Sequence, residues 1–423
     1  MHSSRVKIIF HIGLEKTGTT SFQRFCTRNA RRLMEHKVLY PKRSSAFYLL
    51  NHVPLTASYL PSERPDDFHL RSPIKNSEMV KSLKREIEAS SVEKVIISSE
   101  HLSSRFRAPQ IEKLAEDFNE YECHVVIALR DHLSRLFSSY STRVMSGSDQ
   151  TLDEFAAMVL EPDNLYMRYA DIIRMWEASF GRDNVIVFDY NESSDVIHSI
   201  LSKIGLIQLR TIQTDDHKCN ASLDANVTEA VRLINIANQS VSAYRSKIPY
   251  LEFIKLQYVR SVLRKKLQAQ NLSQKLAHTL SPLPEEARSA VSKGEGASQE
   301  PHGASFETPT SWAPQNEGEA FETGSQSHGS HWRLGQPYRE QLLAIAEADA
   351  LWLAKNYSMP VSLIKPRSLP DAAPEEFQDD AAKLLAKTLT HTISDRWSLY
   401  RFNMASRAAL FFILDKLRSI RGR

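Results

Sequence analysis

The chain has 423 residues, of which 42% are hydrophobic and 25% are charged. This length allows one large domain or two of medium size, and the ordinary balance of apolar and charged residues excludes a chain that is disordered throughout. The net charge of +4 is too small to argue for a nucleic-acid partner, although it suits a protein that holds several phosphate groups.

Alternating strand and helix patterns fill the first half of the chain. A buried strand is expected at residues 6–11, followed by a loop at 13–20 and a helix at 21–35. Further strands are expected at 38–40, 94–98, 124–129 and 184–188, and further helices at 77–89, 110–118, 133–144 and 166–180. This alternation predicts an α/β, three-layer fold with a mainly parallel central sheet flanked by helices.

The pattern changes after residue 205. Residues 225–277 are expected to be mainly helical, and a helix is expected again at about 338–356. Residues 282–330 contain six of the chain's 13 glycines and few branched aliphatic residues, so they cannot bury enough apolar surface to offset the entropy of ordering. We therefore divide the chain into an α/β domain at 1–280, a disordered insertion at 281–335, a helix that completes the domain at 336–364, and a linker with a helical tail at 365–423.

The C-terminal tail combines an apolar stripe at 404–420 with basic residues. Its charged side chains are Arg407, Lys416, Arg418, Arg421 and Arg423 against the single Asp415. Such a helix packs on the protein's own core, which is the more common case, or lies as a peripheral helix on the inner membrane face.

Cysteine content and apolar runs bear on the cellular compartment. Cys26, Cys123 and Cys219 are widely spaced and form no CxxC pair, so they predict neither a zinc site nor a disulfide framework. No secretory signal pattern is visible, and the longest apolar run, at 408–414, is too short to span a bilayer. We therefore expect a cytoplasmic protein.

The loop after the first strand has the composition of an anion-binding site. Backbone N–H groups at a helix N-terminus bind anions, glycines allow close approach, and hydroxyl groups add donors. It is not a Walker A loop, because Thr19 rather than lysine follows Gly18. The sequence therefore predicts a P-loop-like phosphate-binding loop formed by Lys16, Thr17, Gly18, Thr19, Thr20 and Ser21.

A second candidate anion site follows the strand at 124–129. Arg130 stands at the carboxyl end of that strand, where ligands of parallel sheets collect, and Ser138 follows about two helical turns later. A planar guanidinium group and a hydroxyl group suit a terminal phosphate. We therefore expect Arg130 and Ser138 to reach one ligand and to suit its terminal phosphate.

Both segments resemble those of sulfotransferases that use 3′-phosphoadenosine-5′-phosphosulfate (PAPS). The loop resembles the family's 5′-phosphosulfate loop, and the second segment resembles its 3′-phosphate motif. The matching residues of that motif are Arg130, Asp131, Arg135, Ser138 and Tyr140. His132 replaces the usual proline. The resemblance covers roughly residues 6–225 and 338–360 and is to bacterial, carbohydrate-type members.

This resemblance implies a reaction and its partners. It implies transfer of a sulfonate group from PAPS, as co-substrate, to an acceptor hydroxyl on a carbohydrate or glycolipid, without a metal. The alternatives are a P-loop small-molecule kinase and a non-catalytic nucleotide-binding protein. The position of Lys16 argues against the kinase, and the presence of Lys16, Arg130 and Ser138 argues against a degenerate site.

Catalysis needs a cation at the leaving group and a base for the acceptor hydroxyl. Lys16 is the candidate cation. Glu100, at the end of the strand at 94–98, is the first candidate base, followed by His101 and then His52. Each has an ordinary alternative role, because Glu100 could cap the next helix and single histidines are often structural.

Overall fold

A five-stranded sheet lies at the centre of the described structure, and every pair of neighbouring strands in it is parallel. The computed structural model describes residues 5–42, 51–61, 75–190, 195–211, 225–243, 265–267, 269, 332 and 334–360. In sheet order the strands are β2 (Val38–Leu39), β3 (Lys94–Ser98), β1 (Lys7–His11), β4 (Glu122–Leu129) and β5 (Val185–Asp189). The expected α/β fold with a mainly parallel sheet is confirmed.

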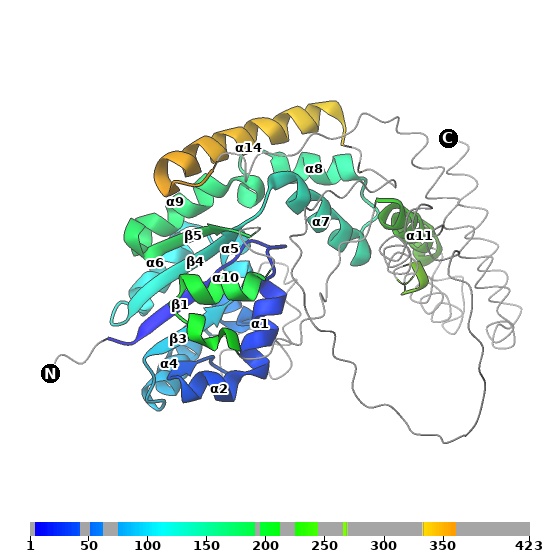
Figure 1. The fold of residues 1–423 in the computed structure, drawn as a ribbon. Helices are drawn as coiled ribbons and strands as arrows, with labels where there is room; N and C mark the ends of the chain where they lie inside the picture. The colour runs from blue at the N-terminus through cyan, green and yellow to red at the C-terminus, as the bar shows by residue number, and fades with distance from the viewer. Residues whose placement is uncertain are drawn as a thin grey trace, which may run out of the picture.

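The helices connect these strands and cover both faces of the sheet (Figure 1). They are α1 (Thr19–Arg28), α2 (Ala30–Glu35), α3 (Val53–Ser58), α4 (Asn76–Glu88), α5 (His101–Arg105), α6 (Ala108–Asp117), α7 (His132–Met145), α8 (Leu152–Leu160), α9 (Tyr169–Phe180), α10 (Val196–Lys203), α11 (Ala225–Ala243) and α14 (Gln336–Tyr357). Within the described ranges, no helix is long and apolar enough to cross a membrane.

Side chains along each strand alternate between the two faces of the sheet, so helices cover both faces and the fold has three layers. Ile8 and Phe10 of β1 point into a core shared with α4, α6 and α9, whereas Ile9 points into a core shared with α1, α2 and α10. Successive side chains of a strand face opposite sides of the sheet, so apolar strands such as these must be covered on both faces. The two cores therefore fix which helices lie on which side.

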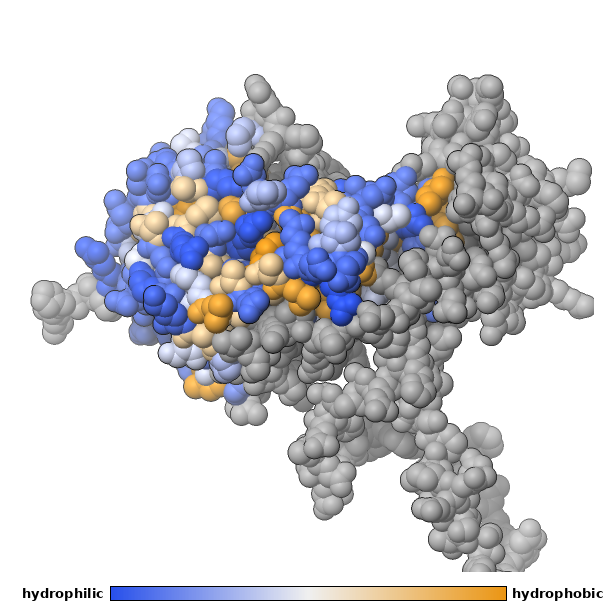
Figure 2. All heavy atoms as spheres, turned by 90° about the horizontal axis from the view of Figure 1, so that it is seen from above, coloured by the Kyte–Doolittle hydropathy of each residue, from blue (hydrophilic) through white to orange (hydrophobic). Residues whose placement is uncertain are grey.

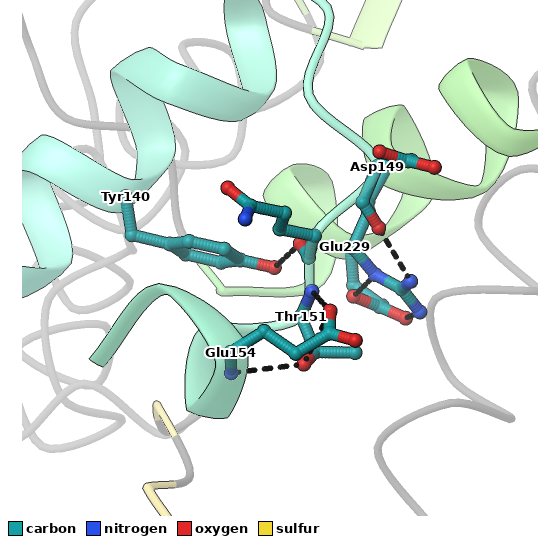
Figure 3. A network of polar contacts seen from close by, with 7 residues as sticks. Tyr140, Asp149, Thr151, Glu154 and Glu229 are labelled. Carbon is teal, nitrogen blue, oxygen red and sulfur yellow. Dashed lines mark hydrogen bonds and ion pairs between the residues drawn. The ribbon is translucent and has the colours of Figure 1, made fainter. Parts of the chain in front are cut away.

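A third apolar cluster joins α7 and α8 to α11 and α14, beyond the sheet. Polar contacts hold the loop between α7 and α8 against α11 (Figure 3). The Tyr140 hydroxyl donates to the carbonyl of Gln150 at 3.1 Å, and Arg232 donates to the carbonyl of Asp149 at 3.1 Å while pairing with Glu229. Tyr140 of the second motif thus has a structural contact.

Several element boundaries differ from the expected ones. The single helix expected at 21–35 is two helices, because the backbone leaves helical geometry at Asn29, whose side-chain amide donates to the carbonyl of Phe25. The short helices α3, α5, α8 and α10 were not predicted. The expected insertion lies outside the described residues except for Trp332, Leu334 and Gly335, and the C-terminal tail lies wholly outside them.

Helix α14 packs on the sheet domain through one face. Leu342, Ile345 and Leu353 are buried, whereas Leu343 and Leu351 are 38% and 59% exposed. Figure 2, which views the molecule from above relative to Figure 1, shows hydrophilic and hydrophobic residues mixed on that surface. The outer face of the domain is therefore an ordinary mixed surface.

The same helix carries a buried carboxylate, Asp349, which is only 5% exposed. It accepts hydrogen bonds from Nε2 of His132 at 2.9 Å, from the N–H of Tyr169 at 2.8 Å and from the N–H of Ala170 at 3.0 Å. Asp349 thus satisfies the first turn of α9 and fixes the first residue of α7. A buried charge is tolerated only when it is bonded in this way.

We expect Asp349→Ala to lower the free energy of unfolding by about 3 kcal/mol, because it leaves buried donors without an acceptor. Urea denaturation measures this. The matched control is Glu347→Ala, at an exposed position of the same helix, which should change stability by no more than ~0.5 kcal/mol. Equal stability of the two variants would contradict the anchoring role.

Candidate active site

The donor loop lies between the end of β1 at His11 and the start of α1 at Thr19. Gly13, Lys16 and Gly18 have positive φ angles of 37°, 73° and 76°. A Cβ atom on Gly13 would lie 2.4 Å from Cγ2 of Thr19, and one on Gly18 would lie 2.8 Å from Cγ1 of Val196. The loop therefore requires glycine at both positions, for conformation and for space.

The residues predicted to bind an anion surround this turn. No side-chain hydrogen bond caps the N-terminus of α1 at Gly18, and an uncapped helix N-terminus is able to hold an anion. Gly18, Thr20 and Ser21 are partly exposed, whereas Thr19 is buried. Thr17 is also buried, and its hydroxyl donates to the carbonyl of Leu14 at 2.6 Å, which stabilises the turn itself.

Residues of the second motif, which begins at Arg130, are hydrogen-bonded to the donor loop. Nη1 of Arg130 donates to the carbonyl of Lys16 at 3.2 Å, and Nζ of Lys16 donates to Oγ1 of Thr142 at 2.6 Å. The Thr142 hydroxyl in turn donates to the carbonyl of Ser138 at 3.1 Å. Lys16, Arg130 and Ser138 therefore come together at the carboxyl ends of β1 and β4, which is the point where the strand order reverses.

Arg135, which matches the second motif, lies behind the loop. Its guanidinium is 1% exposed, donates to the carbonyl of Glu15 at 3.2 Å and to the carbonyl of Tyr166, and lies over the Tyr166 ring. This arginine supports the backbone of the loop.

A carboxylate inside an anion-binding loop is unfavourable unless its charge is compensated. Oε2 of Glu15 accepts a hydrogen bond from the hydroxyl of Tyr166 at 2.8 Å. Burial alone would raise the pKa of Glu15, but this bond and the charge of Arg135 lower it below its usual value. The hydroxyl of Tyr166 and the charge of Arg135 thus stabilise the negative charge of Glu15 within the loop.

Lys16 experiences opposing influences. Burial lowers its pKa below the ordinary lysine value, the nearby charges of Glu15 and Glu100 act in the opposite direction, and Arg130 adds to the lowering. Glu15 and Glu100 therefore favour the charged form of Lys16, which is the form needed at a leaving group.

Glu100 lies at the carboxyl end of β3, next to β1, and is partly exposed. It occupies the N-cap position of α5, but its side chain makes no capping hydrogen bond. Instead, Oε2 of Glu100 accepts a hydrogen bond from Nε2 of Gln23 at 2.8 Å. His101 begins α5 and interacts electrostatically with Glu15. Of the candidate bases, Glu100 is the one whose charge acts on Lys16.

His52 is wholly buried, and both of its ring nitrogens are bonded to backbone groups. Nδ1 accepts from the N–H of Ser98 at 2.9 Å, and Nε2 donates to the carbonyl of Pro41 at 3.0 Å. Burial lowers its pKa to about 4. No ring nitrogen is left for a substrate proton, so the geometry does not favour His52, the third candidate base, and gives it a structural role.

Buried His52 makes the free energy of unfolding depend on pH. Its pKa is about 4 in the folded protein and 6.5 in the unfolded chain, so the unfolded state binds more protons between these values and stability falls as pH falls through that window. The contribution is up to ~1.4 kcal/mol per pH unit. We expect His52→Gln to unfold with a shallower dependence on pH between 4 and 6.5, measured by denaturant titration.

Exposed His36→Gln is the control for this experiment and should keep the wild-type pH dependence. A His52→Gln protein with an unchanged dependence would contradict the buried, neutral state of His52.

In the part of the chain that is described, no group of three or more His, Cys, Asp or Glu residues is placed to hold a metal ion.

Comparison with known proteins adds an independent finding. The family model described as "Sulfotransferase domain" matches residues 7–204. A crystal structure of a sulfotransferase from Alicyclobacillus acidocaldarius is similar at 16% identity with a TM-score of 0.33, over 49% of this chain and 82% of that chain. No curated protein gives a significant match. The matched region, slightly less than half of the chain, contains β1 to β5, the donor loop and the Arg130 segment, so this part of the chain is similar to sulfotransferase domains.

Proposed function

We propose that this protein is a sulfotransferase that uses PAPS as its donor and transfers the sulfonate group to an acceptor hydroxyl. The observation that carries the proposal is the bonded junction between the donor loop and the second motif, through Arg130 and the carbonyl of Lys16 at 3.2 Å. PAPS carries negative charge at two ends, its 5′-phosphosulfate and its 3′-phosphate. Cationic groups on two adjacent strand ends suit such a molecule.

In this proposal each end of PAPS has its own binding groups. The 5′-phosphosulfate lies at the first turn of α1, where Lys16, Gly18 and the N–H groups of Thr19 to Ser21 supply donors. The 3′-phosphate binds Arg130 and Ser138. The ring of Tyr190 lies 5.5 Å from the Arg130 guanidinium, which supports the orientation of that side chain.

The reaction is an in-line displacement at sulfur. The acceptor oxygen forms a bond to sulfur, the bond from sulfur to the bridging oxygen breaks, and its electron pair stays on the 5′-phosphate of adenosine 3′,5′-bisphosphate. Lys16 stabilises the charge that develops on this leaving group more strongly in the transition state than in the ground state. The acceptor proton passes to Glu100, the proposed base.

Glu100 is supported over the other candidates by its surroundings. It is partly exposed, its side chain does not cap α5, and its charge acts on Lys16. His101 is retained as the alternative base because it adjoins Glu100 at the same edge of the sheet.

For the acceptor, we propose a hydroxyl on a carbohydrate or glycolipid. The support is the resemblance of residues 6–225 to bacterial carbohydrate-type sulfotransferases. Transfer of labelled sulfate from PAPS to a panel of glycans and glycolipids tests it, and activity confined to phenols or small alcohols would contradict it.

We expect Lys16→Ala and Arg130→Ala each to weaken the binding of adenosine 3′,5′-bisphosphate by about 1.5–3 kcal/mol, because each removes a charge-assisted hydrogen bond. Isothermal titration calorimetry without magnesium measures the affinity. Lys113→Ala, at a distant ion pair with Asp117, is the control and should bind like the wild type. Unchanged affinity in both site variants, or tighter binding of ATP than of the bisphosphate, would contradict the donor assignment.

We expect Glu100→Gln to keep its affinity for adenosine 3′,5′-bisphosphate but to lose turnover by ~10²-fold or more, because the amide cannot accept the acceptor's proton. Steady-state kinetics with labelled PAPS measures this loss. The comparison variant is His101→Ala. An active Glu100→Gln protein beside an inactive His101→Ala protein would transfer the role of base to His101.

A further inference from the structure

The buried side-chain amide of Gln23 lies between Glu100 and Ser98. Gln23, in the second turn of α1, is only 2% exposed. Its Nε2 donates to Oε2 of Glu100 at 2.8 Å and to Oγ of Ser98 at 3.3 Å. A buried amide is costly unless it is bonded, so these two contacts restrict Gln23 to a single orientation.

The contact with Ser98 is itself fixed from the other side. Oγ of Ser98 lies 2.8 Å from Nδ1 of His11, and both residues are completely buried. Burial lowers the pKa of His11 to about 3, so this imidazole is neutral at physiological pH. His11, Ser98 and Gln23 therefore form an uncharged hydrogen-bonded chain that ends at the carboxylate of Glu100.

Gln23 also belongs to the helix that begins at the donor loop. Helix α1 starts at Thr19, one turn before Gln23, and its apolar face, including Phe22 and Phe25, is packed into the core beneath the sheet. The same rigid element that presents its N-terminus to the donor therefore also holds one oxygen of Glu100.

We propose that Gln23 is a positioning residue for sulfonate transfer, whose amide N–H holds Oε2 of Glu100 and so aims Oε1 at the acceptor hydroxyl. The inference rests on the proposed role of Glu100 as base. Gln23 itself touches neither donor nor acceptor. Its loss changes the orientation of the base while the donor loop keeps its contacts.

The test is a double-mutant cycle on Gln23→Met and Glu100→Gln. Methionine is close to glutamine in length and suits a buried helical position, but it has no N–H donor. In the wild-type background we expect Gln23→Met to lower kcat at least tenfold, with less than a threefold change in KM for PAPS and in the affinity for adenosine 3′,5′-bisphosphate. In the Glu100→Gln background it should have no further effect on kcat, because residues that act through one another are not additive.

The matched control is Thr27→Ala, one turn later on α1, where an exposed side chain donates to the carbonyl of Gln23 at 2.8 Å. It should keep the wild-type kcat. If Gln23→Met does not fold, Gln23→Leu replaces it in the same cycle, since its side chain also has no N–H donor.

The outcomes separate the two proposals. An active Glu100→Gln protein overturns the assignment of the base, whatever Gln23 does. If Glu100→Gln is inactive but Gln23→Met keeps the wild-type kcat, the base stands and the positioning role is wrong. If Gln23→Met lowers kcat by the same factor in both backgrounds, Gln23 is merely structural and the inference is also overturned.

Discussion

The buried guanidinium of Arg135 is the constraint on which the donor loop depends. The loop carries left-handed backbone at Lys16 and a carboxylate at Glu15, and both are unfavourable beside an apolar sheet. Arg135 compensates them together, because it donates to the carbonyl of Glu15 and lies over the ring of Tyr166, whose hydroxyl holds the Glu15 carboxylate. The negative charge of Glu15 is thereby compensated within the loop itself.

The matched family region, residues 7–204, does not supply all the contacts that position the site. His132 stands where the family usually has proline, and a proline could not donate a side-chain hydrogen bond. Here Nε2 of His132 donates to Asp349 of α14, and the His132 ring stacks on Tyr169 at 3.9 Å. The hydroxyl of Tyr169 donates to the carbonyl of Arg130 at 2.8 Å. A helix far along the chain therefore fixes the turn that carries Arg130, in place of proline's rigid ring.

The parts of the fold that sequence analysis predicted are those determined by local pattern. The strand β1 and the loop up to Ser21 are defined by apolar periodicity, glycines and hydroxyl residues within one short segment. The separate helix α2 after Asn29 and the helix α5 were not predicted. With six and five residues, both are too short to show the hydrophobic period of a helix. The contacts of Arg135, His52 and Gln23 were not predicted, for another reason. Each depends on contacts with residues far away in sequence, such as the bond between Gln23 and Glu100, which no local pattern reveals.

Lys16 and Glu100 carry opposite charges, and each is hydrogen-bonded to a neutral side chain. Nζ of Lys16 is held by the hydroxyl of Thr142, and Oε2 of Glu100 is held by the amide of Gln23. A direct ion pair between Lys16 and Glu100 would lower the energy of both charges before the reaction, and it would have to break for one to meet the leaving group and the other to take a proton. A hydroxyl and an amide fix position without that cost. The proposed transfer therefore needs Glu100 close enough to favour the charged form of Lys16, but bonded elsewhere.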